Sequence, residues 1–287
     1  MKQFYKYLTT GPNDMEWGIY LNSAGSLTIP PQTEYPLKSH PSGYYFTWEQ
    51  GRELQEYQLN YITRGNGIFE DRHGIHHLKP GSLLFIFPGE WHRYKPAFQT
   101  GWTENYIGFN GEIAKIFMNH KFFRSDQPVL QVGEREEILD TFLKIFDLVE
   151  KEQPGFQQIA SGLIVQLLGY LVALDKQKGF SGKKIVAVVE EARFRMRSEV
   201  GENFDIEGFA AEQNIGYSYF RRMFKNYTGL SPRQYCLQLK MMRAKELLLS
   251  TNLSVKEISY ELGFESIHYF SRMFKQKTGK SPVEFRG

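Results

Sequence analysis

The stretch HYFSRMFKQKTGKSP (His268–Pro282) decides how this chain is organised, because it nearly repeats SYFRRMFKNYTGLSP (Ser218–Pro232). Between Tyr219–Pro232 and Tyr269–Pro282, ten of fourteen aligned positions are identical. At helical spacing, arginine, lysine and serine or histidine share one side of each copy, while phenylalanine and methionine share the opposite side. Each copy therefore predicts an amphipathic helix with a cationic outer face.

Both predicted helices carry the same end signals. A Thr-Gly pair closes each one, and glycine readily adopts the left-handed backbone that ends a helix. A Ser-Pro pair follows in each copy and starts the next helix, with serine as the N-cap and proline in the first turn.

A shorter helix and a tight turn precede each copy, in FAAEQNIG (Phe209–Gly216) and EISYELGFES (Glu257–Ser266). Gly263 supplies the flexible backbone of the second turn, and Asn214 can do so in the first. A helix, a short turn and a helix with one cationic face form a helix-turn-helix unit, whose second helix enters the major groove of DNA. One such helix alone could be an ordinary basic surface helix. Two copies with matched caps and turns favour DNA binding.

The charge distribution agrees with a polyanionic partner for this end of the chain. Residues 183–287 hold 18 Lys and Arg against 12 Asp and Glu, a net +6, whereas residues 1–182 hold 17 against 20, a net −3. A basic third on an acidic body is typical of a nucleic-acid-binding domain.

The segment from Ile185 to Arg286 resembles the DNA-binding domain of the AraC/XylS family of transcription regulators. The resemblance is carried by MMRAKELLLSTNLSVKEISYELGFESIHYFSRMFKQKTGKSPVEFR, and it implies two helix-turn-helix units that read successive major grooves of double-stranded DNA. Gly216 takes the place of the usual serine cap of the first recognition helix, and Ile267 takes a place that is often polar. From the cationic faces and the family positions together, the candidate DNA-binding residues are Ser218, Arg221, Arg222, Lys225, Ile267, His268, Tyr269, Ser271, Arg272 and Lys275.

The first 110 residues have the pattern of short antiparallel strands. EYQLNYI (Glu56–Ile62) alternates Tyr57, Leu59 and Tyr61 onto one face, RGNG (Arg64–Gly67) predicts a turn, and a buried strand is expected at Leu83–Phe87. Strands at this spacing suggest an antiparallel barrel or sandwich.

From about Glu112 the apolar period becomes helical. EREEILDTFLKIFDLVEKEQ predicts an amphipathic helix, and FQQIASGLIVQLLGYLVALDK predicts a second helix that is apolar around most of its surface. These helices either pack on the barrel and on each other or form a dimer seam. DKQKGFSGKK (Asp175–Lys184) predicts a linker.

The segment from about Pro36 to Gly111 is similar to the cupin-type, arabinose-sensor domain found in the same family. LNYITRGNGIFED, LKPGSLLFIFPGEWHRYKP and GWTENYIGFNG carry this resemblance, which implies a small barrel that binds an effector, expected to be a sugar, in its mouth or interior. Aromatic rings can stack on sugar rings and polar side chains can bond hydroxyls, although Trp91, Trp102 and the tyrosines could equally be core residues. The arginine that such sensors aim at sugar hydroxyls is replaced here by Gln55, with Arg52 nearby. The candidate effector-binding residues are Arg52, Gln55, His92, Tyr94, Trp102, Glu104 and Tyr106.

Histidines offer a rival interpretation as a metal-dependent cupin enzyme. His40, His73, His76, His77 and His92 lie in this region, but RHGIHH (Arg72–His77) is expected in a turn between strands, which holds metal ligands poorly. The sequence also lacks a phosphate-binding glycine-rich loop and a nucleophile–base pair. We therefore expect no metal, no cofactor and no enzymatic activity.

The remaining features limit the setting of the protein. A single cysteine, Cys236, excludes an intrachain disulfide and suits a reducing compartment. The N-terminus lacks a secretory signal, and the apolar run Gly162–Leu174 is shorter than the roughly 20 residues of a membrane span. We expect a cytoplasmic protein without membrane contact.

Together these patterns predict a two-domain α+β protein. Residues 1–110 form a cupin-like antiparallel β-barrel, residues 111–178 form a helical coupling and dimerisation segment, and residues 179–287 form an all-α DNA-binding domain with helix-turn-helix units near 205–228 and 254–278. The expected function is that of a transcription regulator controlled by a small-molecule effector, acting as a homodimer with RNA polymerase as a further partner. The alternative is a ligand-independent regulator whose N-terminal domain only dimerises.

Overall fold

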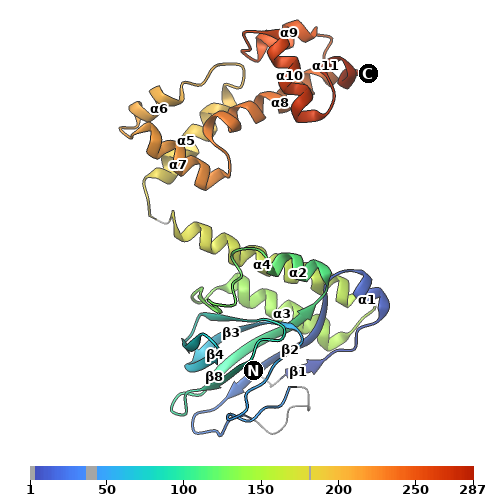
Figure 1. Ribbon diagram of the computed structural model, residues 1–287, viewed down its shortest axis with the longest axis vertical. Coiled ribbons are helices and arrows are strands. Elements are labelled where there is room, and N and C mark those ends of the chain that lie inside the picture. Colours follow the sequence, from blue (N-terminus) through green and yellow to red (C-terminus); the bar gives the residue numbers. More distant parts are fainter. Residues whose placement is uncertain (1–3, 37–43, 181) are drawn as a thin grey trace. The chain divides into compact units, whose positions relative to one another are not determined.

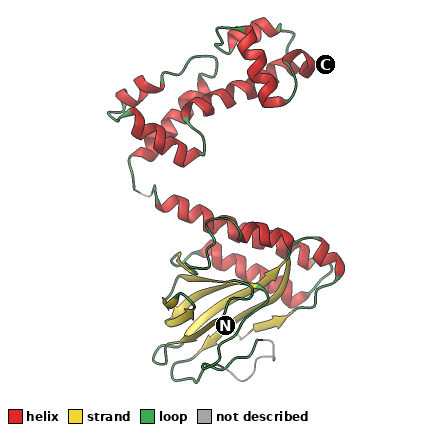
Figure 2. Ribbon diagram, in the orientation of Figure 1, coloured by secondary structure: helices red, strands yellow, loops and turns green. Residues whose placement is uncertain are grey.

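The computed structural model describes residues 4–36, 44–180 and 182–287. The chain divides into two compact units, Met1–Asp175 and Lys176–Gly287. All the strands of the described residues lie in the first unit, whereas the second is built from helices (Figures 1 and 2). The predicted α+β class with an N-terminal antiparallel β domain and a C-terminal helical domain is confirmed.

Two antiparallel sheets form the body of the first unit. The larger has the strand order β1-β2-β8-β3-β6-β9 and the smaller has the order β5-β4-β7. The strands are β1 (Phe4–Tyr7), β2 (Tyr20–Ile29), β3 (Tyr57–Gly65), β4 (Gly67–Asp71), β5 (Gly74–Leu78), β6 (Ser82–Ile86), β7 (His92–Pro96), β8 (Trp102–Asn110) and β9 (Val129–Gln131).

The alternation predicted for β3 sorts its side chains between two cores. Tyr57, Leu59 and Tyr61 lie in the core that the large sheet shares with the helices, whereas Ile62 lies in a second core with residues of β4, β5 and β7. Successive strand residues point to opposite faces, so Gln58 and Asn60 face the second sheet with Ile62. Gly65, with φ of 71°, makes the predicted turn into β4.

Among the described residues, the first unit contains the helices α1 (Pro12–Glu16), α2 (Glu112–Met118) and α3 (Glu136–Lys151), and most of α4 (Phe156–Lys178). The apolar face of α3 is buried in the core under the large sheet, as its sequence period predicts. At the start of α4, the Gln157 side chain bonds both backbone groups of Leu21, and the Ser161 hydroxyl donates to the Ile19 carbonyl at 2.6 Å. These bonds tie α4 to the edge of β2.

One expectation for α4 was wrong. The helix continues to Lys178, so the predicted linker begins later than Asp175. At 23 residues it is also long and apolar enough to cross a membrane by length and composition alone. Ile164, Leu167 and Leu171 of α4 are nevertheless fully buried in the core with the sheet, so this face of the helix packs within the unit.

The second unit contains seven helices in the described residues. They are α5 (Ile185–Ser198), α6 (Ile206–Glu212), α7 (Tyr217–Thr228), α8 (Pro232–Ser250), α9 (Val255–Glu261), α10 (Ile267–Thr278) and α11 (Pro282–Arg286). The helices α6 and α7 form one helix-turn-helix unit, α9 and α10 form the other, and α8 connects them.

The predicted caps and turns of this unit are confirmed. Gly229 and Gly279 end α7 and α10, each with φ of 82°, and Asn214 and Gly263 have φ of 55° and 66° in the two turns. Ser231 and Ser281 begin α8 and α11, each in a capping box with proline in the first turn.

Candidate DNA-binding surface and effector site

The first recognition helix, α7, presents the expected cationic face. Ser218, Arg221, Arg222 and Lys225 are exposed. On the other side, Phe220, Met223 and Phe224 are buried in a core with α5 and α6. Burial of this apolar side leaves the four polar residues free to face DNA.

The second recognition helix, α10, repeats the arrangement with small differences. His268, Tyr269, Arg272 and Lys275 are exposed, whereas Ile267 and Ser271 are half-buried. The helix is anchored by the buried Phe270 and Phe274. The inward placement expected for Met273 is only partly observed, because this side chain is half-buried.

Each recognition helix carries the same tyrosine–arginine pair one turn apart. The Arg222 guanidinium lies 5.7 Å from the ring centroid of Tyr219, and that of Arg272 lies 5.6 Å from Tyr269. The tyrosines are 41% and 45% exposed. A cation within about 6 Å of an aromatic ring is attracted by the face of that ring, so each tyrosine favours a position of the arginine beside it. Tyr219 was not among the predicted site residues, although its place in the repeat matches that of Tyr269.

The two helices differ at their N-caps. Ser266 accepts a hydrogen bond from the Tyr269 amide at 3.4 Å, whereas Gly216 offers no side-chain cap to α7. The departure from the family pattern at Gly216 therefore leaves the first recognition helix less well capped.

In the first unit, several predicted effector residues meet between the two sheets. The Arg52 side chain enters from the segment before β3 and donates to the Tyr94 hydroxyl at 2.7 Å and to His92 Nε2 at 3.3 Å. The guanidinium also lies 5.1 Å from the Tyr94 ring centroid, and the rings of Tyr94 and Trp102 are 5.9 Å apart. Arg52, His92, Tyr94 and Trp102 thus form one contiguous group.

Burial sets the protonation of this group. Desolvation, followed by the positive charge of Arg52, lowers the pKa of His92 to about 3, so its imidazole is neutral near pH 7. Desolvation raises the pKa of Glu104 to about 7, and the nearby Arg52 and Asn60 only partly oppose this rise. Glu104 therefore exchanges between a hydrogen-bond donor and an acceptor form near neutral pH.

Polar atoms without partners gather on the inner face of the large sheet. Glu104 Oε2, both amide atoms of Asn60 and Trp102 Nε1 are buried and lack a hydrogen bond of normal geometry within the described residues. Trp102, Glu104 and Tyr106 are two residues apart in β8, so their side chains share one face of the sheet. Asn60 of β3 is paired with Tyr106 and Ile62 with Glu104, so Asn60 stands on that same face. Buried polar groups are nearly always hydrogen-bonded in proteins, so such a cluster makes this interior a candidate ligand site.

Tyr106 and three unpredicted residues extend the polar lining. Tyr106 is buried and follows Glu104 on the inner face of β8. Glu56 accepts from Ser23 at 2.8 Å and from the Tyr44 hydroxyl at 3.0 Å, and burial raises its pKa. The signal for Glu56 and Asn60 is present in EYQLNYI, where polar residues alternate with the apolar ones that fill the core.

Gln55 does not join this site. Its side chain is exposed, and only its backbone carbonyl is engaged, by the Asn110 amide at 2.8 Å. Gln55 and Glu56 lie in the bend before β3, which leaves the Gln55 side chain exposed and buries that of Glu56. Arg52, rather than residue 55, brings an arginine side chain to this interior.

The histidines do not form a metal site in the part of the chain that the structure describes. His40 lies outside the described residues. His76 and His77 lie on strand β5 rather than in the expected turn, which contains His73, and they point to opposite faces. Among the described residues, no three metal-ligating side chains converge.

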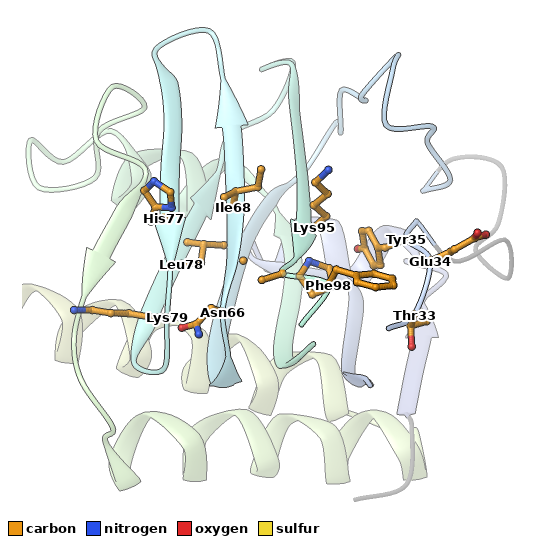
Figure 3. Close-up of a pocket in the computed structure, with 13 residues that line it drawn as sticks. Thr33, Glu34, Tyr35, Asn66, Ile68, His77, Leu78, Lys79, Lys95 and Phe98 are labelled. Carbon is orange, nitrogen blue, oxygen red and sulfur yellow. The ribbon is translucent and has the colours of Figure 1, made fainter. Parts of the chain in front are cut away.

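A groove of about 770 Å³ lies on the outer side of the small sheet (Figure 3). Its walls come from β4, β5, β7 and the segment at Thr33–Tyr35, and none of the seven predicted effector residues lines it. Tyr35 and Leu78 line the groove and also pack in the interior core, where the Tyr35 ring is 6.2 Å from that of Tyr94 and 6.3 Å from that of Trp102. Space therefore lies outside the sheets, whereas the unpartnered polar groups lie between them.

Comparison with known proteins agrees with both halves of this description. The AraC-like ligand binding domain matches residues 32–168, and a helix-turn-helix domain matches residues 209–287. The lactose operon transcription activator of Staphylococcus xylosus is 24% identical over 233 residues, which cover 78% of this chain and 79% of that protein. The arabinose operon regulatory protein of Escherichia coli K12 is 27% identical over 243 residues, which cover 81% of each.

Among solved structures, the C-terminal domain of AraT from Geobacillus stearothermophilus is 32% identical to the part it matches. It covers 36% of this chain and 87% of that domain, with a TM-score of 0.34.

The two matched domains define a DNA-binding transcription regulator with an N-terminal ligand-binding domain, not an enzyme. The chain belongs to the AraC family of transcription regulators.

Proposed function

We propose that the effector of this regulator is a sugar bound between the two sheets of the first unit. The observation that carries the proposal is the cluster of buried polar atoms without partners at Glu104, Asn60 and Trp102. Hydroxyl groups both donate and accept hydrogen bonds, so a polyhydroxyl ligand can satisfy the amide, the carboxyl and the indole N–H together. The Tyr94 and Trp102 rings supply apolar faces for the sugar ring.

The names of related proteins support the same class of ligand. The relatives that match over most of the chain include the lactose and arabinose operon regulators. The inner residues also suit a ligand without charge, because Arg52 is already engaged by Tyr94 and His92 and a second carboxylate, Glu56, lies nearby.

Residues 111–178 couple effector binding to DNA binding in this proposal, as the seam of a homodimer. The exposed side of α4 carries Ile159, Gly162 and Gly169, and a Cβ added at either glycine meets nothing within 4 Å. Gly162 and Gly169 are two turns apart on one face, where small residues allow the close approach of a helix from a second copy. An effector that binds one dimer arrangement better than another shifts the presentation of the DNA-binding units.

The setting of this activity follows from its chemistry. We place the protein in the cytoplasm, where DNA and RNA polymerase are accessible and where a lone thiol at Cys236 stays reduced. We propose activation as the sense of control, with RNA polymerase as the further partner, because the lactose operon relative is named as an activator.

A thermal-shift screen against neutral monosaccharides, short oligosaccharides and sugar acids tests the proposed effector. A ligand at 100 times its Kd stabilises the native state by about 2.7 kcal/mol, which is readily observed. We expect a neutral sugar to shift the transition, and Asn60→Ala and Tyr94→Ala to remove the shift. The matched control is Ile68→Ala, which alters the outer groove and leaves the interior unchanged.

Two outcomes would contradict the proposal. A shift that Ile68→Ala removes and Asn60→Ala preserves would place the ligand in the outer groove. The absence of any shift across the panel would favour the alternative, in which the first unit only dimerises.

A further inference from the structure

The two halves of the DNA-binding unit have separate hydrophobic cores. One core holds buried residues of α5, α6 and α7, and the other holds buried residues of α9, α10 and the later part of α8. The helix α8 contributes to both, with Tyr235 and Leu239 near the first and Met241 and Leu247 in the second. Since each recognition helix belongs to its own core, the angle between α7 and α10 depends on what joins the halves.

The loop between α5 and α6 provides a second connection beside α8. Val200 packs against the second core, whereas Phe204 packs against the first. Gly201 approaches the turn before α10 so closely that a Cβ added at Gly263 would lie 2.5 Å from the Gly201 carbonyl oxygen. The loop is therefore seated on the turn of the second helix-turn-helix unit.

Lys240 of α8 lies at this junction and is only 9% exposed. Its Nζ donates to Asn203 Oδ1 of the loop at 3.0 Å and lies 5.4 Å from the ring centroid of Phe264, which follows Gly263 in the turn. A single side chain thus contacts the loop of the first half and the turn of the second half.

The cation at this position has no carboxylate partner. None of the ion pairs within the described ranges involves Lys240, and burial lowers the pKa of its ammonium group. Burying an ammonium costs free energy, whereas an apolar residue such as methionine would fill the space without that cost. Core packing alone therefore gives no reason for lysine here.

We propose that Lys240 and Asn203 form a clasp that fixes the angle and spacing between the two recognition helices. With the clasp closed, one chain presents α7 and α10 to two major grooves at a single separation. When two recognition helices are held rigidly together, binding of the first raises the effective concentration of the second at its own groove. Lys240 is a positioning residue, since it acts through the loop and the turn and lies on neither cationic face.

The test uses the full chain and a DNA site selected from a random library by the wild-type protein. Three kinds of probe derive from that site: the intact sequence, versions with either half scrambled, and versions with one or two base pairs inserted between the halves. The variants are Lys240→Met and Asn203→Ala, with Lys240→Arg as the conservative replacement. Lys245→Met, on the same helix but outside the junction, controls for the loss of one positive charge.

We expect Lys240→Met to weaken binding to the intact site by about tenfold or more, with at most a twofold change on the half-scrambled probes. The penalty for inserted base pairs should be smaller in Lys240→Met than in the wild type, because a loosened pair tolerates more spacings. Lys240→Arg should restore most of the intact-site affinity, and Lys245→Met should show neither effect.

Two results would overturn the proposal. If Lys240→Met binds the intact site within twofold of wild type and has the same spacing dependence, no clasp operates. If it weakens all probes equally, the lysine serves the fold or the net charge. Asn203 is exposed, so Asn203→Ala keeps the proposal testable even if Lys240→Met does not fold, and it should relax the spacing dependence in the same direction.

Discussion

Replacement of Glu104 by glutamine should change how the stability of the first unit depends on pH. Glu104 is 1% exposed, and burial raises its pKa from an ordinary value of 4.5 to about 7. The folded state therefore binds this proton more tightly than the unfolded state does. The tighter binding of this proton by the folded state stabilises the protein. This stabilisation by Glu104 is fully present below pH 4.5 and is lost as pH rises through about 7.

The magnitude follows from the distance between these two pKa values. Each pH unit corresponds to about 1.4 kcal/mol, so the ionised carboxylate costs the folded protein about 3 kcal/mol relative to its protonated form. Between pH 5 and pH 8, the wild type should lose about 2–3 kcal/mol of unfolding free energy relative to Glu104→Gln. Glutamine keeps the shape of the side chain and does not titrate.

His92 makes this comparison with a variant necessary. Its pKa is lowered to about 3, so its contribution to stability is present above pH 6.5 and is lost as pH falls. The two residues thus oppose each other between pH 4.5 and 6.5 in the wild type. The difference between wild type and Glu104→Gln cancels the effect of His92, which is the same in both proteins.

Urea unfolding followed by tryptophan fluorescence is the appropriate assay. All four tryptophans, at positions 17, 48, 91 and 102, lie in the first unit, so the signal reports on the barrel without the DNA-binding unit. Parallel stability curves for the two proteins from pH 5 to pH 8 would contradict this prediction, because they would show that Glu104 ionises as easily when folded as when unfolded.

Three further predictions concern the helical unit. Gly216→Ser should stabilise this unit by a few tenths of a kcal/mol because serine caps α7, and Ser266→Gly should destabilise it by a similar amount. Far-UV circular dichroism during urea unfolding measures both changes. Equal effects in the same direction would contradict the assignment of the caps. Gly279→Ala should cost about 1 kcal/mol because φ is 82° there, and a neutral result in the same unfolding experiment would show that the αL cap relaxes. Tyr219→Leu should weaken specific DNA binding several-fold while Tyr219→Phe should not, since phenylalanine keeps the ring beside Arg222. Equal affinities of the two variants in a fluorescence-anisotropy titration would show that the ring has no role in DNA binding.

Local patterns predicted the DNA-binding unit closely. Its caps, turns and cationic faces depend on residues within one or two helical turns, so Gly229, Asn214 and Ser231 could be assigned from their neighbours alone. The residues that line the interior between the two sheets were only partly predictable. Asn60 and Glu56 were visible as polar positions in a strand, but their meeting with Arg52, Tyr94 and Glu104 depends on how distant strands pair.

Other features depend on tertiary contacts and left little trace in the sequence. The placement of Gln55 outside the site depends on the bend before β3, which exposes Gln55 and buries Glu56. The continuation of α4 to Lys178 overrode a segment whose polar composition predicted a linker. The burial of Lys240 could not be predicted, because it results from a loop more than thirty residues away in the chain.

The claim that both helix-turn-helix units read DNA is tested most directly by footprinting a selected site with Arg222→Ala and Arg272→Ala. Each arginine lies on the exposed face of a different recognition helix, and loss of a base contact costs about 1–3 kcal/mol. We expect each variant, folded as shown by circular dichroism, to lose protection in one half of the site, and the two variants to lose different halves. Unchanged footprints, or loss of the same half in both variants, would contradict this claim.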